Sequence, residues 1–319
     1  MADDDVDLDL LRVSARQFLA DRGEKESVKD LAAMDWTGLL VDEVVGGAGW
    51  RPVETCVIAE ELGRANYRSA WLGTTVAAAA LASAPDDLRE QLLPGLLAGT
   101  MAAGVTVVNG SARIIRGNEV DIIVLLGRNG IHVIRDPDPA RTVLDGDLLD
   151  VTRTVWRIDL TDAPSTLIGP PDRATELTAV ARLLVAADSV GATSMTLERL
   201  TAYLRERVAF GAPIASFQAI QHRLVELLVF EVKARAVVMK AARAIASADQ
   251  RATTLTAAAH AFVAAKATAA VDECMQLSGG IGFTWEYPLH HEMRRVFTNA
   301  QLMGTARSSR ALLAEVSGW

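Results

Sequence analysis

The sequence predicts a mainly helical protein that contains one small β domain. Of its 319 residues 50% are hydrophobic but only 5% are aromatic, and such an alanine- and leucine-rich composition favours helices. Apolar residues recur at helical spacing in the first and last thirds of the chain, whereas β-rich runs are confined to the middle. A chain of this length can bury a large core, and the length suggests about two packed modules.

Residues 1–100 are expected to form an N-terminal helical domain. An apolar stripe at helical spacing begins near the N-terminus and consists of Leu8, Leu11, Ala15, Phe18 and Leu19. Residues 69–85 carry no charge, but they are built largely from small residues and barely reach the length that would span a membrane. We therefore expect a buried helix there. The glycine cluster Gly46-Gly47-Ala48-Gly49 predicts a flexible turn when it is taken alone.

Residues 101–165 are expected to form a reduced middle β-domain. Short β-rich runs occupy residues 103–108, 120–126, 131–134 and 155–160. Asn129-Gly130 stands between two of these runs, which is a strong signal for a two-residue hairpin. Trp156 and Ile158 alternate with Arg157, as in a half-buried strand. We expect a small antiparallel sheet or an open barrel.

Residues 166–319 are expected to form a C-terminal four-helix bundle. One apolar face consists of Met195, Leu197, Leu200 and Leu204, and another consists of Ile220, Leu224, Leu227 and Leu228. Glu231 and Arg235 make an (i, i+4) pair that we place on a solvated helix face. The alanine-rich run 252–270 predicts a long helix that can pack closely.

Composition excludes several function classes. The formal net charge of −8 and the pI of about 5.2 argue against a nucleic-acid partner. Cys56 and Cys274 form no C-x-x-C pair, and the N-terminus is acidic, so we expect a reduced, cytoplasmic protein without a membrane partner. His290-His291-Glu292 lacks the H-E-x-x-H spacing, so we expect no metal site.

Several separated motifs in the last third carry groups that suit a nucleotide. Arg207 offers a planar guanidinium that can bind a pyrophosphate at two points. Gly279-Gly280 lacks Cβ atoms, so the backbone can approach a ligand and offer N–H groups to it. The side chains of Gln218 and Gln276 each carry a donor and an acceptor. Taken singly, each piece also fits a surface helix residue, a helix C-cap or a solvated amide.

Together these pieces resemble the acyl-CoA dehydrogenase family, whose pattern runs R-x-x-F-G-x-P-I, F-Q, Q-x-x-G-G-x-G, E-Y-P and Y-E-G-T. The chain carries Arg207 to Ile214, Phe217-Gln218, Gln276 to Phe283, Glu286-Tyr287-Pro288 and Gly304-Thr305 in that order. Glu60 to Ala65 resembles the E-E-L-G-R-A of the same family. The resemblance implies that FAD is the cofactor and that one set of residues holds it, namely Arg207, Phe210, Gln218, Gln276, Gly279, Gly280 and Thr305.

The chain departs from the family at the catalytic base. Desaturation of an acyl-CoA thioester needs a base to remove the α-proton, and the family supplies a glutamate from one of two positions. Here those positions hold Met303 and Ala181, so we assign no catalytic residue. Glu176, Glu198 and Glu226 lie on nearby predicted helices, where a solvated helix face is the simpler interpretation. Arg182 is a candidate substrate contact, and a structural ion pair is an equal alternative.

The middle region departs from the family as well. The T-E-P-x-x-G-S and W-I-T stretches that cover one face of the flavin are absent, and residues 105–110 and 122–126 stand in their place. The chain thus resembles the paired short subunits of α2β2 heterotetrameric acyl-CoA dehydrogenases from actinobacterial steroid degradation. The expected partners are a homologous subunit that carries the glutamate, an acyl-CoA substrate and electron-transfer flavoprotein. The alternatives are a homotetramer with a relocated base and a flavin-free assembly subunit.

Overall fold

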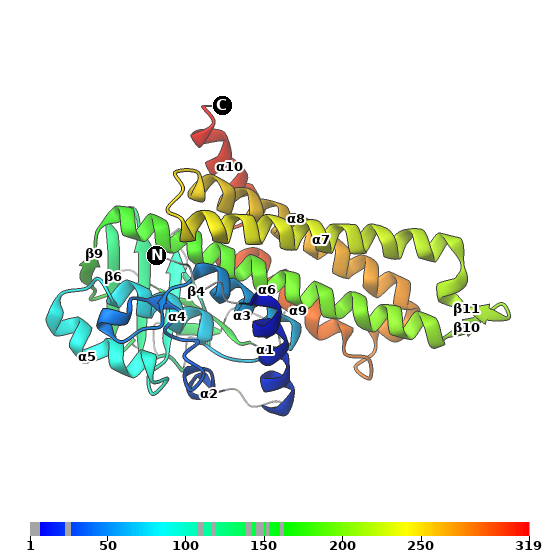
Figure 1. Cartoon of the computed structure of the whole chain (residues 1–319), viewed down its shortest axis with the longest axis horizontal. Helices are drawn as coiled ribbons and strands as arrows, with labels where there is room; N and C mark the ends of the chain where they lie inside the picture. Colours follow the sequence, from blue (N-terminus) through cyan, green and yellow to red (C-terminus); the bar gives the residue numbers. More distant parts are fainter. Residues whose placement is uncertain are drawn as a thin grey trace.

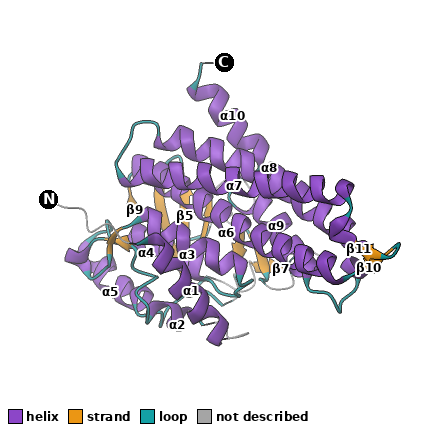
Figure 2. Cartoon of the chain, turned by 45° about the vertical axis from the view of Figure 1, so that its right-hand side comes forward, coloured by secondary structure: helices purple, strands orange, loops and turns teal. Residues whose placement is uncertain are grey.

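The computed structural model describes residues 7–22, 27–107, 112–116, 119–137, 142–144, 150, 153–159 and 163–318. It confirms the expected order of an N-terminal helical region, a small β region and a C-terminal helical bundle. The strands of the β region gather at one end of the long helices, and the β10–β11 hairpin projects from the opposite end (Figure 1). Figure 2 shows the same division by secondary structure, with the main strands partly behind the helices.

The N-terminal region is built around two largely buried helices, Pro52–Arg64 and Trp71–Leu81. Its elements are α1 (Leu8–Arg22), α2 (Val28–Ala32), β1 (Leu40–Val41), η1 (Glu43–Val45), β2 (Gly49–Trp50), α3 (Pro52–Arg64), α4 (Trp71–Leu81) and α5 (Asp86–Leu97). The predicted stripe on α1 is confirmed, because Ala15 and Leu19 are buried in the core. Every residue of α4 is buried, as expected for the uncharged stretch. The predicted glycine turn follows η1, where Gly46 has a φ of +90°.

The β region contains two sheets rather than the single antiparallel sheet or barrel that we predicted. Its strands are β3 (Ala103–Val107), β4 (Ala112–Ile115), β5 (Ile122–Gly127), β6 (Gly130–Arg135), β7 (Thr142–Leu144), β8 (Val155–Ile158) and β9 (Thr166–Gly169). The sheets have the orders β3-β5-β6-β9 and β4-β8-β7. Strands β3 and β5 are parallel, because the chain passes through β4 in the other sheet before it returns. Strand β9 pairs with β6 and carries the first sheet beyond residue 165.

The predicted hairpin exists, one residue away from its expected position. Gly127 lies opposite Gly130 in the β5–β6 ladder, so the turn residues are Arg128 and Asn129. Gly130 begins β6 with a φ of +116°, a conformation that favours glycine. On β8, Ile158 is buried as predicted, whereas Trp156 is half-buried. Val108 and Leu160, which belonged to predicted strands, lie outside the described residues.

The bundle is formed by α6 (Pro171–Glu206), α7 (Gln218–Ala246), α8 (Ala252–Ser278) and α9 (Leu289–Leu302), and α10 (Ala306–Val316) packs on α8. Strands β10 (Val208–Ala209) and β11 (Ala212–Pro213) with η3 (Ile214–Ser216) join α6 to α7, and η4 (Gly279–Phe283) follows α8. Helix α6 is central, since it packs against α3, α7, α8 and α9. The predicted four-helix bundle is therefore confirmed.

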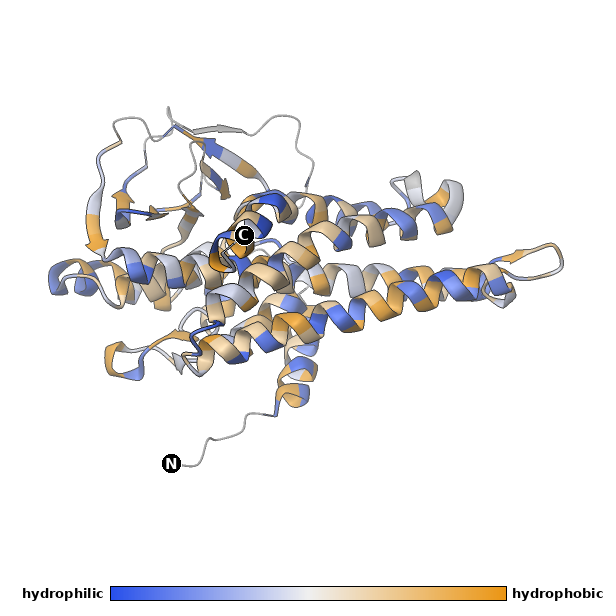
Figure 3. Ribbon diagram, turned by 90° about the horizontal axis from the view of Figure 1, so that it is seen from above, coloured by the Kyte–Doolittle hydropathy of each residue, from blue (hydrophilic) through white to orange (hydrophobic). Residues whose placement is uncertain are grey.

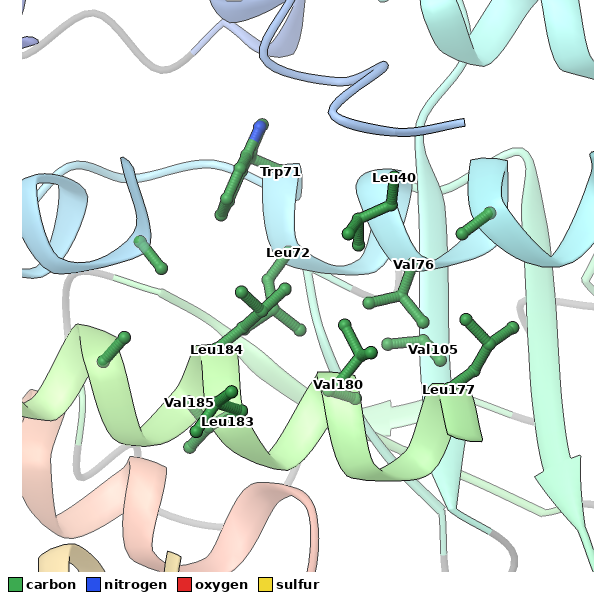
Figure 4. Close-up of a cluster of buried hydrophobic side chains, with 14 of the residues drawn as sticks. Leu40, Trp71, Leu72, Val76, Val105, Leu177, Val180, Leu183, Leu184 and Val185 are labelled. Carbon is green, nitrogen blue, oxygen red and sulfur yellow. The ribbon is translucent and has the colours of Figure 1, made fainter. Parts of the chain in front are cut away.

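The core joins the N-terminal helices to the bundle through close packing of helices. Figure 4 shows Leu72 and Val76 of α4 above Val180 and Leu184 of α6, and these four side chains are buried. Helices α3 and α6 approach more closely still. A Cβ atom added to Gly191 would lie 1.8 Å from the carbonyl oxygen of Glu60, so the two backbones touch at this point.

Two predictions about the surface of α7 are wrong. Leu228 is 49% exposed rather than part of the core, and it lines an open groove between α6 and α7. Glu231 does pair with Arg235, at 2.6 Å, but the carboxylate is buried rather than solvated. Arg235 also reaches Glu60 of α3 at 2.8 Å. Through Arg235, the pair on α7 is therefore linked to α3 as well, rather than lying on the surface of one helix.

Two stretches are long and apolar enough to cross a membrane by length and composition, which the sequence analysis did not anticipate. They are Pro171–Glu206 and Ala252–Gly282, and 83% and 50% of their most apolar windows are buried inside the fold. Figure 3 shows both polar and apolar residues along the long helices of the bundle. Burial against α3, α7 and α9 accounts for the apolar content of α6.

Candidate functional site

Most of the predicted flavin-binding residues gather at the free end of the bundle, which we call the distal end. Arg207 caps the C-terminus of α6, and its N–H group bonds to the carbonyl of Tyr203 at 2.9 Å. Phe210 lies in the β10–β11 turn with a φ of +53°, a strained value for a non-glycine residue. Its side chain is 99% exposed. A strained and fully exposed aromatic residue is suited to contact with a second molecule.

The remaining distal residues lie on the neighbouring helix ends. Gln218 begins α7 and Gln276 lies in the last turn of α8, and both residues are exposed. Gly279 has a φ of +66°, and a Cβ atom added to Gly279 or Gly280 would meet nothing within 4 Å. The guanidinium of Arg207 makes no ion pair with another described residue. The distal end thus offers a cation, two amides and open space above a glycine pair, which fit the phosphates and polar edges of a dinucleotide.

Thr305, the remaining residue predicted to hold FAD, lies apart from this group. It caps α10, and its hydroxyl accepts from the N–H of Ser308 at 3.2 Å. Ser309, the residue after Ser308 on α10, forms a hydrogen bond with His260 of α8 at 2.9 Å. Because an α-helix rises 1.5 Å per residue, Gly279 lies roughly 28 Å along α8 from His260. The sequence could not reveal this separation, because α9 runs back along the bundle between Gly280 and Thr305.

The two positions where the family places its base meet near Thr305, which we call the proximal end. Ala181 has 0% and Met303 has 2% of its surface exposed. The Arg182 side chain connects them, since its Nε donates to the carbonyl oxygen of Met303 at 3.0 Å. Burial lowers the pKa of Arg182. Burial and the charge of Arg182 also lower the pKa of His260, to about 4, so this imidazole is neutral near pH 7.

A cleft of about 370 Å³ opens at the proximal end, and Arg182 forms part of its wall. Its walls come from α6, α8, α10 and the β5–β6 turn. Several threonines line it, among them Thr256, whose buried hydroxyl oxygen has no hydrogen-bond partner among the described residues. Among the described lining residues Glu315 is the one carboxylate, and it is exposed on the C-terminal helix. Sequence reasoning missed Glu315 because it follows the last recognised motif.

The three glutamates considered as relocated bases occupy surface positions, which agrees with their simpler interpretation as residues of a solvated helix face. Glu176 pairs with Arg173 at 2.5 Å, and its side chain is 44% exposed. Glu198 pairs with Arg64 and is 61% exposed. Glu226 is exposed on α7. The Glu176 and Glu198 carboxylates are already engaged by an arginine, which disfavours proton abstraction by either.

A buried charge network, also missed, lies between the two ends. Arg295 of α9 donates to both carboxylate oxygens of Asp188, at 2.9 and 2.5 Å. Asn299 adds a bond at 2.6 Å, and Arg153 approaches Asp188 at 3.6 Å. Burial alone would raise the pKa of Asp188, but the two guanidinium groups and the hydrogen bonds outweigh it and hold the pKa below its usual value. Every charge is paired, so the network is structural.

A second cleft, of about 610 Å³, lies between the N-terminal helices and the bundle. Glu292 forms part of its wall, has a fully buried side chain, and is held by Arg199 at 2.5 Å. Burial raises the pKa of Glu292 against the opposing effect of Arg199. His291 also lines this cleft, and the neighbouring His290 ring meets Trp285 edge-on, with ring centroids 4.6 Å apart.

The outer face of α7 carries an apolar patch that we call the α7 patch. Val225, Leu228, Val229 and Val232 are 57%, 49%, 44% and 54% exposed, respectively. Their spacing places them on one helix face. A groove of about 760 Å³ between α6 and α7 adjoins them, and Val225 and Leu228 form part of its wall. The groove also contains Gln221, near the distal end. Aliphatic side chains so exposed on one face indicate a surface that another protein covers.

Comparison with known proteins gives matches at both ends of the chain. The family model described as the acyl-CoA dehydrogenase N-terminal domain matches residues 9–100. The model described as the acyl-CoA dehydrogenase C-terminal domain matches residues 172–318. The chain is 34% identical over 304 residues to the acyl-CoA dehydrogenase IpdE2 of Mycobacterium tuberculosis. This match covers 93% of this chain and 89% of that protein.

Solved structures share the fold. A variant of the steroid ACAD Tcur3481-Tcur3483 superposes with a TM-score of 0.83 at 22% identity, over 98% of this chain and 97% of that chain. The ChsE4-ChsE5 complex from Mycobacterium tuberculosis gives a TM-score of 0.82 at 18% identity, over 97% of both chains. At these identities the likeness concerns the fold alone.

Proposed function

Because the chain belongs to the acyl-CoA dehydrogenase family, we propose that it is a subunit that completes the FAD site of a partner subunit. The assembled enzyme desaturates an acyl-CoA thioester between its α and β carbons. The partner is a homologous chain that supplies the catalytic glutamate. One observation carries this proposal: groups that suit a dinucleotide lie exposed at the distal end, whereas the two family base positions hold Ala181 and Met303, which cannot accept a proton.

The distal residues would hold the diphosphate and adenosine portion of FAD. Arg207 would bind phosphate oxygens, the backbone at Gly279 and Gly280 would approach them, and the amides of Gln218 and Gln276 would bind polar edges. Phe210 would pack against the partner or the cofactor. FAD, when bound, accepts a hydride from the substrate. Because all of these groups are exposed, they can reach a cofactor that is seated mainly in another chain.

The residues at the proximal end support the proposal that the partner subunit, and not this chain, removes the α-proton. Met303 cannot accept a proton, and neither can Ala181. The guanidinium of Arg182 bonds to the Met303 carbonyl. A cation there stabilises the ionised form of a nearby carboxylate and so lowers its basicity. A positioned base is typically worth about 10²- to 10⁴-fold in rate, so this chain alone should not turn over substrate.

Assembly with a partner is supported by the α7 patch and by the relatives. The patch and its adjoining groove lie close to the distal end, where Gln221 and Arg205 form part of the groove wall. Two solved structures with the same fold bear paired names, Tcur3481-Tcur3483 and the ChsE4-ChsE5 complex, and the first is called a steroid ACAD. We therefore propose a heteromer that acts on a steroid-derived acyl-CoA and passes electrons to electron-transfer flavoprotein.

We propose three modules for the chain, at residues 1–100, 101–165 and 166–319. The two family models, at 9–100 and 172–318, support the outer modules. The pairing of β9 with β6 favours an end of the middle module a few residues later, at Gly169.

The test compares the chain purified alone with the chain co-expressed with an adjacent family member from the same genome. We expect flavin absorbance and acyl-CoA oxidation from the complex and neither from the chain alone. Arg207→Ala in this chain should lower flavin occupancy of the complex without loss of assembly, measured by absorbance and gel filtration. Arg243→Ala, which removes an exposed arginine in the last turn of α7 at the other end of the bundle, is the control. Turnover by the lone chain, or full flavin occupancy with Arg207→Ala, would contradict the proposal.

A further inference from the structure

The cleft beside Glu292, between the N-terminal helices and the bundle, has two buried polar atoms on its wall that lack a hydrogen-bond partner among the described residues. They are Oε2 of Glu292 and Nδ1 of His291. We propose that this cleft binds a neutral, compact alcohol, whose hydroxyl group donates a hydrogen bond to Glu292. The site shares no residue with the groups assigned to FAD or with the two family base positions, and its occupation requires neither FAD nor a partner subunit.

The first step concerns Glu292, whose side chain is 1% exposed. Its Oε1 accepts a hydrogen bond from Arg199 at 2.5 Å, whereas its Oε2 has no partner among the described residues. Buried polar atoms are normally hydrogen-bonded, because burial otherwise takes them out of water without compensation. The cleft wall thus presents a carboxylate oxygen that lacks a donor.

The second step concerns the donors of the chain that line the same cleft. Arg16 donates to both carboxylate oxygens of Glu61, at 2.8 and 3.0 Å. Arg64 donates to Glu198, and Arg199 donates to the other oxygen of Glu292 itself. Because these three guanidinium groups are engaged elsewhere, we assign the missing donor to a molecule bound in the cleft.

The third step concerns the charge of that molecule. Arg16, Arg64 and Arg199 on the cleft wall oppose a bound cation, and the buried carboxylates of Glu61 and Glu292 oppose a bound anion. A hydroxyl group is neutral and can donate as well as accept. It therefore suits a carboxylate oxygen that stands among arginines which already have acidic partners.

The fourth step concerns the remainder of the ligand. Apolar side chains on the cleft wall come from four segments, and they are Leu19 and Ala20 of α1, Ala65 at the end of α3, Met195 of α6 and Pro288 before α9. Polar side chains stand between them, so the wall is mixed. The cleft volume of about 610 Å³ lies within the usual range of ligand pockets. Such a wall suits a compact hydrocarbon ring system that carries a hydroxyl group.

The probe is borneol, a bicyclic alcohol, titrated by calorimetry into the full-length chain at pH 8, which favours the ionised form of Glu292. Camphor has the same skeleton with a carbonyl in place of the hydroxyl, so it cannot donate. We expect saturable binding of borneol and binding of camphor about ten- to a hundredfold weaker, because the hydrogen bond to a charged group is lost. Protonated bornylamine should also bind more weakly than borneol, because the arginines oppose it.

Three results of these titrations would overturn the proposal. The first is the absence of saturable borneol binding, which would leave Oε2 of Glu292 to a water molecule. The second is equal binding of camphor, and the third is binding of bornylamine as tight as that of borneol.

A matched pair of variants tests whether Glu292 is the acceptor. In Glu292→Gln the amide carbonyl must face Arg199, because two donors cannot bond to each other. The amide NH2 then replaces Oε2 as a donor, so the preference for borneol over camphor should fall to within about threefold. Glu176→Gln makes the same substitution in a glutamate that pairs with Arg173 outside the cleft, and it should keep the preference. If Glu292→Gln keeps it as well, Glu292 is not the acceptor.

A further variant tests the location of the site without changing Glu292. Ala20 is exposed on α1 and lines the cleft. Ala20→Trp should occupy part of the cleft and weaken borneol binding at least tenfold, while the melting temperature stays at that of the wild type. Unchanged borneol binding by this variant would place the alcohol elsewhere and contradict the proposal.

Discussion

Replacing Asp188 by asparagine should destabilise the protein by about 3–5 kcal/mol, the usual cost of removing one partner from a buried ion pair. The substitution keeps the shape of the side chain but removes its charge. Asp188 accepts both bonds from Arg295 and the bond from Asn299, with Arg153 3.6 Å away. Both guanidinium groups would stay buried, each with about 3% of the side chain exposed.

The magnitude follows from what the variant leaves behind. Asp150 still pairs with Arg153 at 3.1 Å, so one cation keeps an acidic partner. Arg295 keeps the carbonyl oxygen of Tyr67 at 2.9 Å but loses its carboxylate. Because the pKa of Asp188 is lowered in the folded state, its contribution is fully present above the unfolded-state pKa of about 3.9 and is lost as pH falls through the folded-state pKa.

The assay is urea unfolding at pH 7, followed by tryptophan fluorescence and circular dichroism. The control is Asp86→Asn, which breaks the exposed Asp86–Arg89 pair (Asp86 is 80% exposed) and should cost less than about 1 kcal/mol. If the Asp188 variant unfolds within 1 kcal/mol of the control, the carboxylate does not hold the network together, and the reasoning about buried charge fails.

Three further predictions concern other parts of the molecule. Glu292→Gln should gain stability relative to the wild type as pH rises, because the pKa of Glu292 is raised in the folded state and the contribution of Glu292 to wild-type stability is lost as pH passes through that pKa. The melting temperatures of the variant and the wild type should therefore diverge between pH 4, 6 and 8. A difference that stays constant across these pH values would contradict this. Gly191→Ala should destabilise the fold by at least the usual cost of overpacking, about 1–3 kcal/mol, whereas Gly280→Ala, whose Cβ meets nothing within 4 Å, should melt like the wild type; equal melting temperatures would refute the contact. Leu228→Glu should weaken assembly with the co-expressed partner in gel filtration, whereas glutamate at Val44, which is 92% exposed outside the α7 patch, should not; an intact complex in both cases would exclude the α7 patch as an interface.

The helices were predictable because their signals are local. The Ala15 and Leu19 stripe, the uncharged α4 and the leucines of α6 each repeat at helical spacing within one segment. The strands β4, β7 and β9 were not predicted, because runs of three or four residues carry little pattern of their own. The parallel pairing of β3 with β5 depends on where β4 is placed, which is a long-range property.

Sequence motifs single out the residues of the candidate site, which stay a prediction, but they do not give the arrangement of these residues in space. Glycine pairs and arginines at motif spacing identify Gly279-Gly280 and Arg207 in the sequence. The spacing does not say that Thr305 lies at the opposite end of α8, since that depends on the direction of α9. Sequence order also could not pair Asp188 with Arg295, or reveal that Arg182 has no carboxylate beside it. Such pairings follow from helix packing, which a single sequence does not encode in any local pattern.

The contact between α3 and α6 limits how the molecule can move. A sliding step of one turn would bring a side chain against a carbonyl group, because Gly63 and Gly191 each leave no room for even a methyl group. Helices α3 and α6 therefore resist sliding past one another. The cleft beside Glu292 can still widen by rotation of side chains such as Arg199, which takes place on a nanosecond scale and needs no such slide.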